Sequence, residues 1–162
     1  MNCLSCGAPL RPGELPALMV CLHCGTSRRP PDASMHGDRV APLDTSSEMD
    51  CPRCDHALIQ ATVDGRRADY CPGCHGILFE APIFADVVWN RRVMYRGTEA
   101  TPQPIDPELM KQVIDCPQCQ QRMEVHPHYG PGRALIDSCS GCQIVWLDHL
   151  ELTSLERTPG RR

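Results

Sequence analysis

The chain has 162 residues and a formal net charge of −4, with only 2 Phe, 2 Trp and 3 Tyr against 16 Pro and 12 Gly. A domain of ordinary size buries more large apolar side chains than this, so an apolar core alone is not expected to stabilise the fold. The acidic balance argues against a protein that binds nucleic acid non-specifically, because such proteins are usually basic. The 12 cysteines are the remaining candidates for stabilising the fold.

The N-terminal segment indicates the compartment in which these cysteines act. The run MNCLSCGAPLRPGELP has no basic stretch followed by an apolar run, so it does not have the pattern of a secretory signal peptide. The sequence contains no window of about 18 apolar residues, so no membrane-spanning helix is predicted. We therefore expect a cytoplasmic protein, in which reduced cysteines at regular spacing favour a metal over disulfides.

Every cysteine belongs to a C-x-x-C pair, and the pairs group into three sets of two. Within the sets the pairs are separated by 14, 16 and 19 residues, and between the sets by 26 and 41 residues. This spacing is a strong signature of tetrahedral zinc sites. We therefore predict three structural Zn²⁺ ions, each bound by four thiolates. The predicted ligands are Cys3, Cys6, Cys21, Cys24, Cys51, Cys54, Cys71, Cys74, Cys116, Cys119, Cys139 and Cys142.

Other interpretations of the cysteine pairs are weaker. The expected compartment disfavours disulfides, and no βαβ pattern surrounds any C-x-x-C pair, as a thioredoxin-like site would require. Iron is chemically possible, since a tetrahedral four-sulfur site suits both metals. Because each site has four cysteines available, His23 and His75 are expected to lie beside the metal without binding it. His56, His126 and His128 are expected to face solvent.

The segments inside each set predict β-hairpins that return the chain to the metal. In the second set, LIQATV and RRADYC flank Asp64-Gly65, which is typical of a two-residue hairpin turn. In the third, RMEVHPH and RALIDSC flank residues 129–132, and Pro12-Gly13 is the expected turn of the first. The predicted fold class is small, metal-stabilised and mainly β, with three tandem zinc ribbons, short flanking α-helices and flexible linkers.

The domain organisation follows from the sets and the composition between them. Residues 31–49 are rich in Pro, Ser and Asp without an apolar period, which predicts a flexible linker. The predicted order is an N-terminal ribbon at 1–30, a linker at 31–49, a second ribbon with a helix at 50–97, a linker with a short helix at 98–112, and a third ribbon with a C-terminal helix at 113–158.

A helix is predicted at 82–95, where Pro82 suits the first helical turn. This helix is apolar over much of its circumference, so it must be buried against another surface. The surface can be a neighbouring unit of the same chain or another protein. The predicted partner-binding residues on it are Phe84, Val88, Trp89, Arg91 and Arg92.

Capping signals predict two shorter helices. One starts at Asp106-Pro107 and continues through ELMKQVI, with Asp106 as its N-cap. The other starts at Asp148, where DHLE fits the capping-box pattern with an aspartate cap.

The second and third sets resemble a known family, the transcription factor IIB-type zinc-ribbon proteins, which occur widely in bacteria. In that family a second C-x-x-C runs into Gly-Ile-Trp-Leu-Asp-x-x-Glu-Leu. The third set resembles this pattern at Cys139, Cys142, Val145, Trp146, Leu147, Asp148, Glu151 and Leu152. The second set resembles it at Cys71, Cys74, Gly76, Ile77, Phe79 and Glu80.

Each set also departs from the family pattern. The third set has Ile144 where the family has Gly, and the second set has Leu78 where the family has Trp. The resemblance covers residues 51 to about 85 and 116 to about 156, and the first set shares only the cysteines. It implies zinc ribbons, and it does not by itself imply an activity in transcription.

A site of four cysteines leaves no coordination position for water or substrate, so catalysis at these metals is not expected. The sequence presents no convincing nucleophile, base or phosphate-binding loop, and we predict that the chain is not an enzyme. We expect a protein–protein adaptor, a subunit or accessory factor of a larger assembly, in which several ribbons engage one or more protein partners.

Binding to nucleic acid or the transcription machinery is the alternative. Its support is the arginine groups Arg28-Arg29 and Arg66-Arg67 and the cluster of Arg91, Arg92 and Arg96. The acidic balance and the scarcity of aromatic residues for base stacking argue against it. Zinc storage or redox sensing is a third possibility, disfavoured because sites of four cysteines hold zinc tightly.

Overall fold

The structure of the chain is a computed structural model in which two compact units are distinguished. The N-terminal unit extends over Met1–His36 and the C-terminal unit over Gly37–Arg162. The structure describes residues 8, 10–12, 19–25, 27–28, 37–54, 56–101, 104–128 and 134–159. Among these residues, none of the helices has the length and apolar character needed to cross a membrane.

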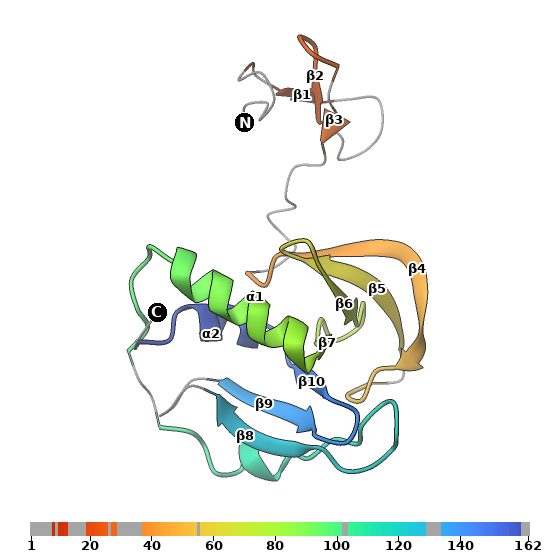
Figure 1. The fold of residues 1–162 in the computed structure, drawn as a ribbon, viewed down its shortest axis with the longest axis vertical. Coiled ribbons are helices and arrows are strands. Elements are labelled where there is room, and N and C mark those ends of the chain that lie inside the picture. The colour runs from red at the N-terminus through yellow and green to blue at the C-terminus, as the bar shows by residue number, and fades with distance from the viewer. Residues whose placement is uncertain are drawn as a thin grey trace. The chain divides into compact units, whose positions relative to one another are not determined.

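The N-terminal unit contains a three-stranded sheet formed by β1 (Leu10–Pro12), β2 (Met19–Cys21) and β3 (Ser27–Arg28) (Figure 1). β1 pairs antiparallel with β2, as a hairpin requires, and the expected turn at Gly13 lies outside the described residues. Gly25 has φ 72° and donates its N–H to the carbonyl oxygen of Cys21 at 2.9 Å. Glycine adopts this left-handed conformation without steric cost.

The C-terminal unit is built on one seven-stranded sheet in the order β4-β5-β6-β7-β10-β9-β8 (Figure 1). Its neighbouring strands all pair antiparallel. The strands are β4 (Val40–Asp50), β5 (Ala57–Val63), β6 (Arg66–Tyr70), β7 (Ile77–Glu80), β8 (Glu124–His128), β9 (Ala134–Cys139) and β10 (Ile144–Leu147). The helices are α1 (Ala81–Met94), the 3₁₀ turn η1 (Leu109–Lys111) and α2 (Glu151–Glu156).

The hairpin of the second ribbon has the predicted turn. β5 and β6 pair up to Val63 and Arg66, which leaves Asp64 and Gly65 as the loop. Both loop residues have positive φ, 50° and 79°, as a type I′ turn requires. In the third ribbon β8 pairs with β9 as predicted, and its loop at 129–133 lies outside the described residues.

The prediction of a linker at 31–49 is wrong from Val40 onward. The segment Val40–Asp50 is an edge strand, β4, paired with β5 through two register shifts. Most of its side chains are exposed, so it has no apolar period that the sequence could reveal. Pro42 is compatible with a strand here because an edge strand has unpaired N–H positions.

The second and third ribbons are also not the separate domains that were predicted at 50–97 and 113–158. β7 of the second ribbon pairs antiparallel with β10 of the third, so both ribbons share the one sheet. Leu78 lies opposite Trp146 at the centre of this pairing. Each of these two residues is the fourth residue after the second C-x-x-C pair, or knuckle, of its ribbon. The two ribbons are therefore related by a pseudo-twofold axis through this pair.

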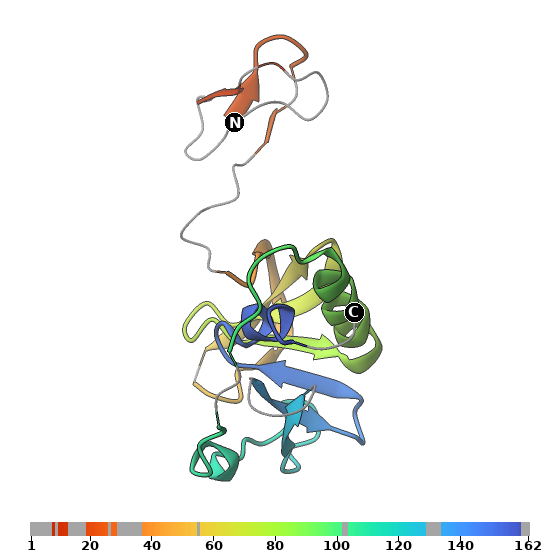
Figure 2. The ribbon, with the colours of Figure 1, turned by 90° about the vertical axis from the view of Figure 1, so that its left-hand side faces the viewer.

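The pseudo-twofold axis relates a second-ribbon half (residues 50–94) to a third-ribbon half (residues 115–156). Under it β5 corresponds to β8, β6 to β9, β7 to β10 and α1 to α2. The two helices follow corresponding strands and contact each other (Figures 1 and 2). This arrangement gives α1 an apolar surface within its own chain.

The helix predicted at 82–95 is confirmed as α1, but the prediction that its apolar side binds a partner is wrong for four of the five named residues. Phe84, Val88, Arg91 and Arg92 are 4%, 1%, 3% and 3% exposed. They are buried because α1 packs on α2 and on the sheet, an arrangement that depends on the pairing of β7 with β10. Trp89 alone is on the outer side, 54% exposed.

The shorter predicted helices are only partly present. The segment after Asp106-Pro107 forms a single 3₁₀ turn, η1, with the Glu108 N–H bound to Asp106 Oδ1 at 2.9 Å. α2 starts at Glu151, and Glu151 Oε2 accepts the backbone N–H of Asp148 at 2.7 Å, as in a capping box. The side chain of Asp148 does not cap α2, because its Oδ1 accepts the indole N–H of Trp146 at 2.9 Å.

The N-terminus of α2 is capped from a distant part of the chain. Asp38, which is 1% exposed, accepts the N–H of Leu150 at 2.7 Å and the N–H and hydroxyl of Thr153, both at 2.8 Å. Its carbonyl oxygen accepts a hydrogen bond from Arg91 of α1 at 2.5 Å. Asp38, which precedes β4 in the chain, thus connects α1 and α2.

Candidate metal centres

The second ribbon brings four cysteine sulfurs together. The Sγ atoms of Cys51, Cys54, Cys71 and Cys74 all lie within 4.8 Å of one another. Cys51 Sγ is 3.5 Å from Cys74 Sγ, and Cys54 Sγ is 3.4 Å from Cys71 Sγ. A tetrahedral site with Zn–S bonds of about 2.3 Å places its sulfurs about 3.8 Å apart. A disulfide requires about 2.05 Å, so the sulfurs are spaced for a metal.

The third ribbon repeats this cluster at the pseudo-twofold-related position. The Sγ atoms of Cys116, Cys119, Cys139 and Cys142 also lie within 4.8 Å of one another, with 3.7 Å between Cys119 and Cys139. The two clusters supply eight of the twelve predicted ligands. In the first ribbon Cys21 is buried and Cys24 exposed, while Cys3 and Cys6 lie outside the described residues, so the third predicted site is not tested.

The C-x-x-C pairs Cys71–Cys74 and Cys116–Cys119 are each closed by a backbone hydrogen bond from a left-handed residue after the second cysteine. The N–H of His75 donates to the Cys71 carbonyl oxygen at 3.0 Å, and that of Gln120 to Cys116 at 2.8 Å. His75 and Gln120 have φ 64° and 59° at the position where the first ribbon has Gly25. Non-glycine residues rarely adopt this conformation, so the knuckles hold it against a local cost.

The thiols in these clusters need a cation before all of them can ionise. Burial raises the pKa of Cys74 to about 11, and the neighbouring thiol of Cys119 raises that of Cys142 to about 12. The backbone N–H of Gln121 lowers the pKa of Cys119 itself to about 7. A bound divalent cation removes the mutual repulsion and keeps coordinating thiols deprotonated. Four sulfurs at this spacing fit Zn²⁺ in a closed site.

The histidines near the second site make other contacts. The ring of His75 lies 2.5 Å, Nδ1 to Oη, from Tyr70, while His56 is exposed, as expected, with Nδ1 3.5 Å from Cys54 Sγ. The expectation that His126 and His128 face solvent is wrong. His126 Nε2 lies 3.0 Å from Ser138 Oγ, and both rings are partly buried.

His128 is drawn inward because its strand, β8, packs beneath α1. Its ring centroid is 5.0 Å from that of Phe84. Burial lowers the pKa of His128 to about 4.

One core contains both metal clusters. It includes Leu58, Leu78, Ile114, Met123, Ile144, Trp146 and the ligands Cys51, Cys71, Cys116 and Cys139. Trp146 is 0% exposed at its centre. A Cβ added to Gly76 would lie 2.1 Å from Cζ2 of Trp146, so the second ribbon needs glycine to accept the tryptophan of the third.

Residues 50–82 match the sequence profile of a family described as transcription factor zinc-finger, of the TFIIB zinc-ribbon type. The second ribbon is therefore similar to this family. The four-cysteine cluster at residues 116–142 indicates a second ribbon of the same kind. No curated protein and no solved structure matches the chain significantly.

The pseudo-twofold axis explains why both ribbons depart from the family pattern. Gly76 lies against Trp146, and the corresponding pair on the other side of the axis is Ile144 and Leu78. Both of these belong to the core that surrounds the metal clusters. A smaller residue in place of tryptophan thus accompanies a larger residue in place of glycine, which conserves core volume.

The substitution Gly76→Ala is expected to lower the free energy of unfolding by about 1–3 kcal/mol, because overpacking a close-packed core forces backbone shifts. Guanidinium chloride unfolding of the zinc-loaded chain measures the change. Gly141→Ala is the matched control, since a Cβ at Gly141 meets nothing within 4 Å. Equal unfolding midpoints for the two variants would show that the core accommodates an extra methyl group beside Trp146.

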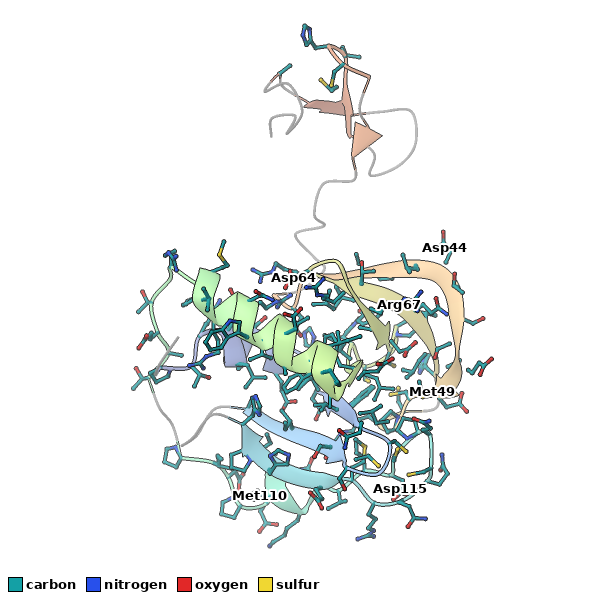
Figure 3. All side chains as sticks on the ribbon, in the orientation of Figure 1. Asp44, Met49, Asp64, Arg67, Met110 and Asp115 are labelled. Carbon is teal, nitrogen blue, oxygen red and sulfur yellow. The ribbon has the colours of Figure 1, made fainter. Side chains whose placement is uncertain are left out.

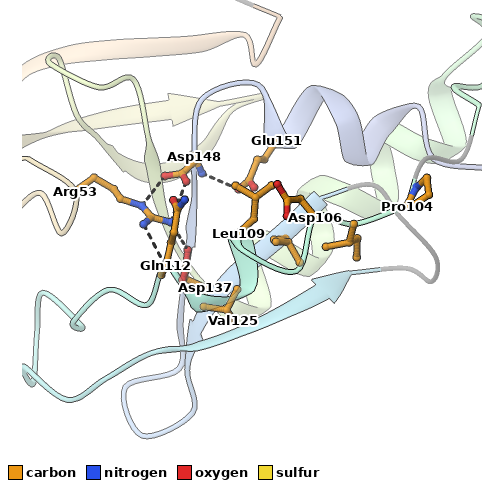
Figure 4. Close-up of a pocket in the computed structure, with 11 residues that line it drawn as sticks. Arg53, Pro104, Asp106, Leu109, Gln112, Val125, Asp137, Asp148 and Glu151 are labelled. Carbon is orange, nitrogen blue, oxygen red and sulfur yellow. Dashed lines mark hydrogen bonds and ion pairs between the residues drawn. The ribbon is translucent and has the colours of Figure 1, made fainter.

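The ion pairs that connect the two ribbons have no signature in the sequence. Arg53, within the CPRC knuckle, donates from Nε to Asp148 Oδ1 at 3.0 Å and from Nη2 to Asp137 Oδ2 at 3.2 Å (Figure 4). Nη1 of Arg53 donates to the carbonyl oxygen of Gln112 at 3.3 Å. The partners are 59 to 95 residues away in the chain, so no local pattern marks them.

Proposed function

We propose that the chain is a non-catalytic zinc-binding adaptor that binds one or more protein partners, as a subunit or accessory factor of a larger cytoplasmic assembly. The metal clusters support a structural role for zinc, because a site with four cysteine ligands has no position open for water or substrate. Zinc organises the ribbons before a partner binds, which lowers the ordering cost of association.

The observation that carries this proposal is Trp89. It lies on the outer side of α1 and is 54% exposed, whereas the inner side of the same helix is fully used within the fold. Met94, 72% exposed, is a second exposed apolar side chain at the end of the helix. Tryptophan is enriched at the energetic centres of protein interfaces, and a helix fixed by its other side presents it rigidly.

Some of the arginines behind the alternative, nucleic-acid binding, make contacts within the fold. Arg91 and Arg92 are each 3% exposed, and Arg91 forms an ion pair with Asp64. Arg66 binds Asp86 at 2.6 Å. Arg67 remains exposed on β6 (Figure 3). Two of the arginines that suggested phosphate contacts, Arg66 and Arg91, are thus paired with carboxylates of the same chain.

Affinity purification from native cell lysate, with and without nuclease, tests the adaptor proposal. We expect to capture a stoichiometric protein partner whose recovery is unchanged by nuclease. The Trp89→Ser variant should recover at least tenfold less of this partner, with its zinc content unchanged. Leu43→Ser is the matched control, because Leu43 is an apolar residue 44% exposed on β4 instead of α1. Recovery that collapses with nuclease would favour nucleic acid, and equal capture by both variants would contradict the role of Trp89.

A further inference from the structure

A cleft between the third-ribbon half, residues 104–112 and Arg53 of the second ribbon combines a carboxylate floor with apolar walls. Its volume is about 270 Å³, close to the lower limit of small-ligand pockets, about 300 Å³, and suited to a single side chain. The walls include Leu109, Val125 and Leu135. Asp106, Asp137, Asp148 and Glu151 supply the carboxylates and Arg53 the one cation of the lining (Figure 4).

The charges in this cleft do not balance. Arg53 is committed to two of the four carboxylates, with 3.2 Å to Asp137 and 3.0 Å to Asp148. Asp106 and Glu151 accept only backbone N–H groups, from Glu108 and Asp148. Two carboxylates of the lining therefore have no cationic partner among the described residues.

A buried oxygen gives independent evidence that a donor is missing. The side chain of Asp137 is 4% exposed and lines the cleft, and its Oδ1 has no hydrogen-bond partner although Oδ2 binds Arg53. Buried carboxylate oxygens are normally paired, because leaving one unpaired costs about 1–3 kcal/mol or more. Asp137, the residue that carries this unpartnered atom, lines the same cleft as the excess negative charge.

The pseudo-twofold axis allows the carboxylates of the two halves to be compared. Asp69 and Glu80 of the second-ribbon half correspond to Asp137 and Asp148, so the carboxylate pair is common to both halves. Glu151 corresponds to Ile83, so its carboxyl is an addition of the third-ribbon half. Burial raises the pKa of Glu151 to about 8.

The spacing of the carboxylates selects the kind of cation. Within the described chain, only the cysteine clusters bring three or more ligand atoms within 4.8 Å, so these carboxylates do not surround a single metal ion. A larger cation with several donors fits better. Arg53 demonstrates that a guanidinium pairs with both carboxylates of the floor, through Nε and Nη2.

We propose that this cleft binds an arginine side chain of a protein partner. The methylene groups of the arginine pack against Leu109, Val125 and Leu135, and its guanidinium reaches Glu151 and the unpartnered oxygen of Asp137. A guanidinium offers five N–H donors in a fixed plane, which suits carboxylates arranged around a cleft. The inference rests on the proposed adaptor function and names the chemistry of the partner.

The test is an NMR titration of the ¹⁵N-labelled, zinc-loaded full chain with N-acetyl-arginine amide. N-acetyl-citrulline amide is the neutral control of nearly the same shape. We expect saturable shifts of the Leu109, Val125 and Glu151 amides with the arginine probe and at least tenfold weaker binding of the citrulline probe. Equal binding of the two probes, or shifts spread over the acidic residues of both halves, would overturn the proposal.

Two variants localise the effect. Glu151→Gln keeps an oxygen to accept the Asp148 N–H but removes the charge, and it is expected to weaken arginine binding at least threefold. Glu80→Gln, at the position related to Asp148 by the axis, is expected to leave it unchanged. Equal losses in both variants would mean that the probe binds the acidic surface non-specifically.

The two proposals fail differently. Partner capture from lysate that persists while the arginine probe does not bind overturns the cleft and leaves the adaptor function intact. Arginine binding that persists while no protein partner is captured overturns the adaptor function and leaves the cleft as a guanidinium site.

Discussion

Replacing Cys139 with serine is expected to unfold both zinc ribbons of the C-terminal unit, not the third ribbon alone. The substitution removes one thiolate from the cluster of the third ribbon. An apparent binding free energy of about 10–16 kcal/mol for structural zinc is then largely lost. That loss is as large as the total stability of an ordinary domain, about 5–15 kcal/mol. Cys51, Cys71, Cys116 and Cys139 share one core around Trp146, so neither ribbon keeps its apolar contacts alone.

Zinc content and amide signal dispersion measure this outcome. We expect Cys139→Ser to lose both zinc ions of the C-terminal unit and the dispersed signals of Ala68 and Tyr70, which lie in the second ribbon. Cys21→Ser is the matched control, because Cys21 belongs to the separate N-terminal unit, and it should leave those signals unchanged. A Cys139→Ser protein that keeps zinc and dispersion in the second ribbon would show that the ribbons fold independently.

The features predicted correctly are those fixed by neighbouring residues. The C-x-x-C spacing determines which thiols can reach one metal, and Asp64-Gly65 determines a hairpin because both residues accept positive φ. The family resemblance of residues 50–82 rests on the same local pattern. Local patterns therefore gave eight described ligands and the hairpin of the second ribbon.

The features that were missed depend on contacts between distant segments. β4 is a strand because β5 offers it a paired edge, although its own side chains are largely exposed. Phe84 and Val88 are buried because α2 and the sheet lie beneath α1, and α2 is there only because β7 pairs with β10. The excess apolar character of this helix predicted burial correctly but could not distinguish a neighbouring ribbon from another protein.

Replacing Asp38 with alanine is expected to lower the free energy of unfolding of the C-terminal unit by about 3–5 kcal/mol, because three donors lose a buried carboxylate at once. These donors are the N–H of Leu150 and the N–H and hydroxyl of Thr153. A helix as short as α2, six residues, cannot form without tertiary support. The loss of its cap therefore affects Leu152 and Leu155, both 0% exposed in the core beneath α1.

Guanidinium chloride unfolding in the presence of zinc measures this loss, and amide hydrogen exchange locates it. Exchange at Leu150 and Thr153 should accelerate more than exchange at β5 and β6, because the cap acts first on α2. Asp44→Ala is the matched control, since Asp44 is an exposed aspartate on β4 with no hydrogen bond or ion pair in the described part of the chain (Figure 3). If the two variants unfold at the same denaturant concentration, water replaces the carboxylate at α2, and the connection from Asp38 to the helices is not what stabilises the unit.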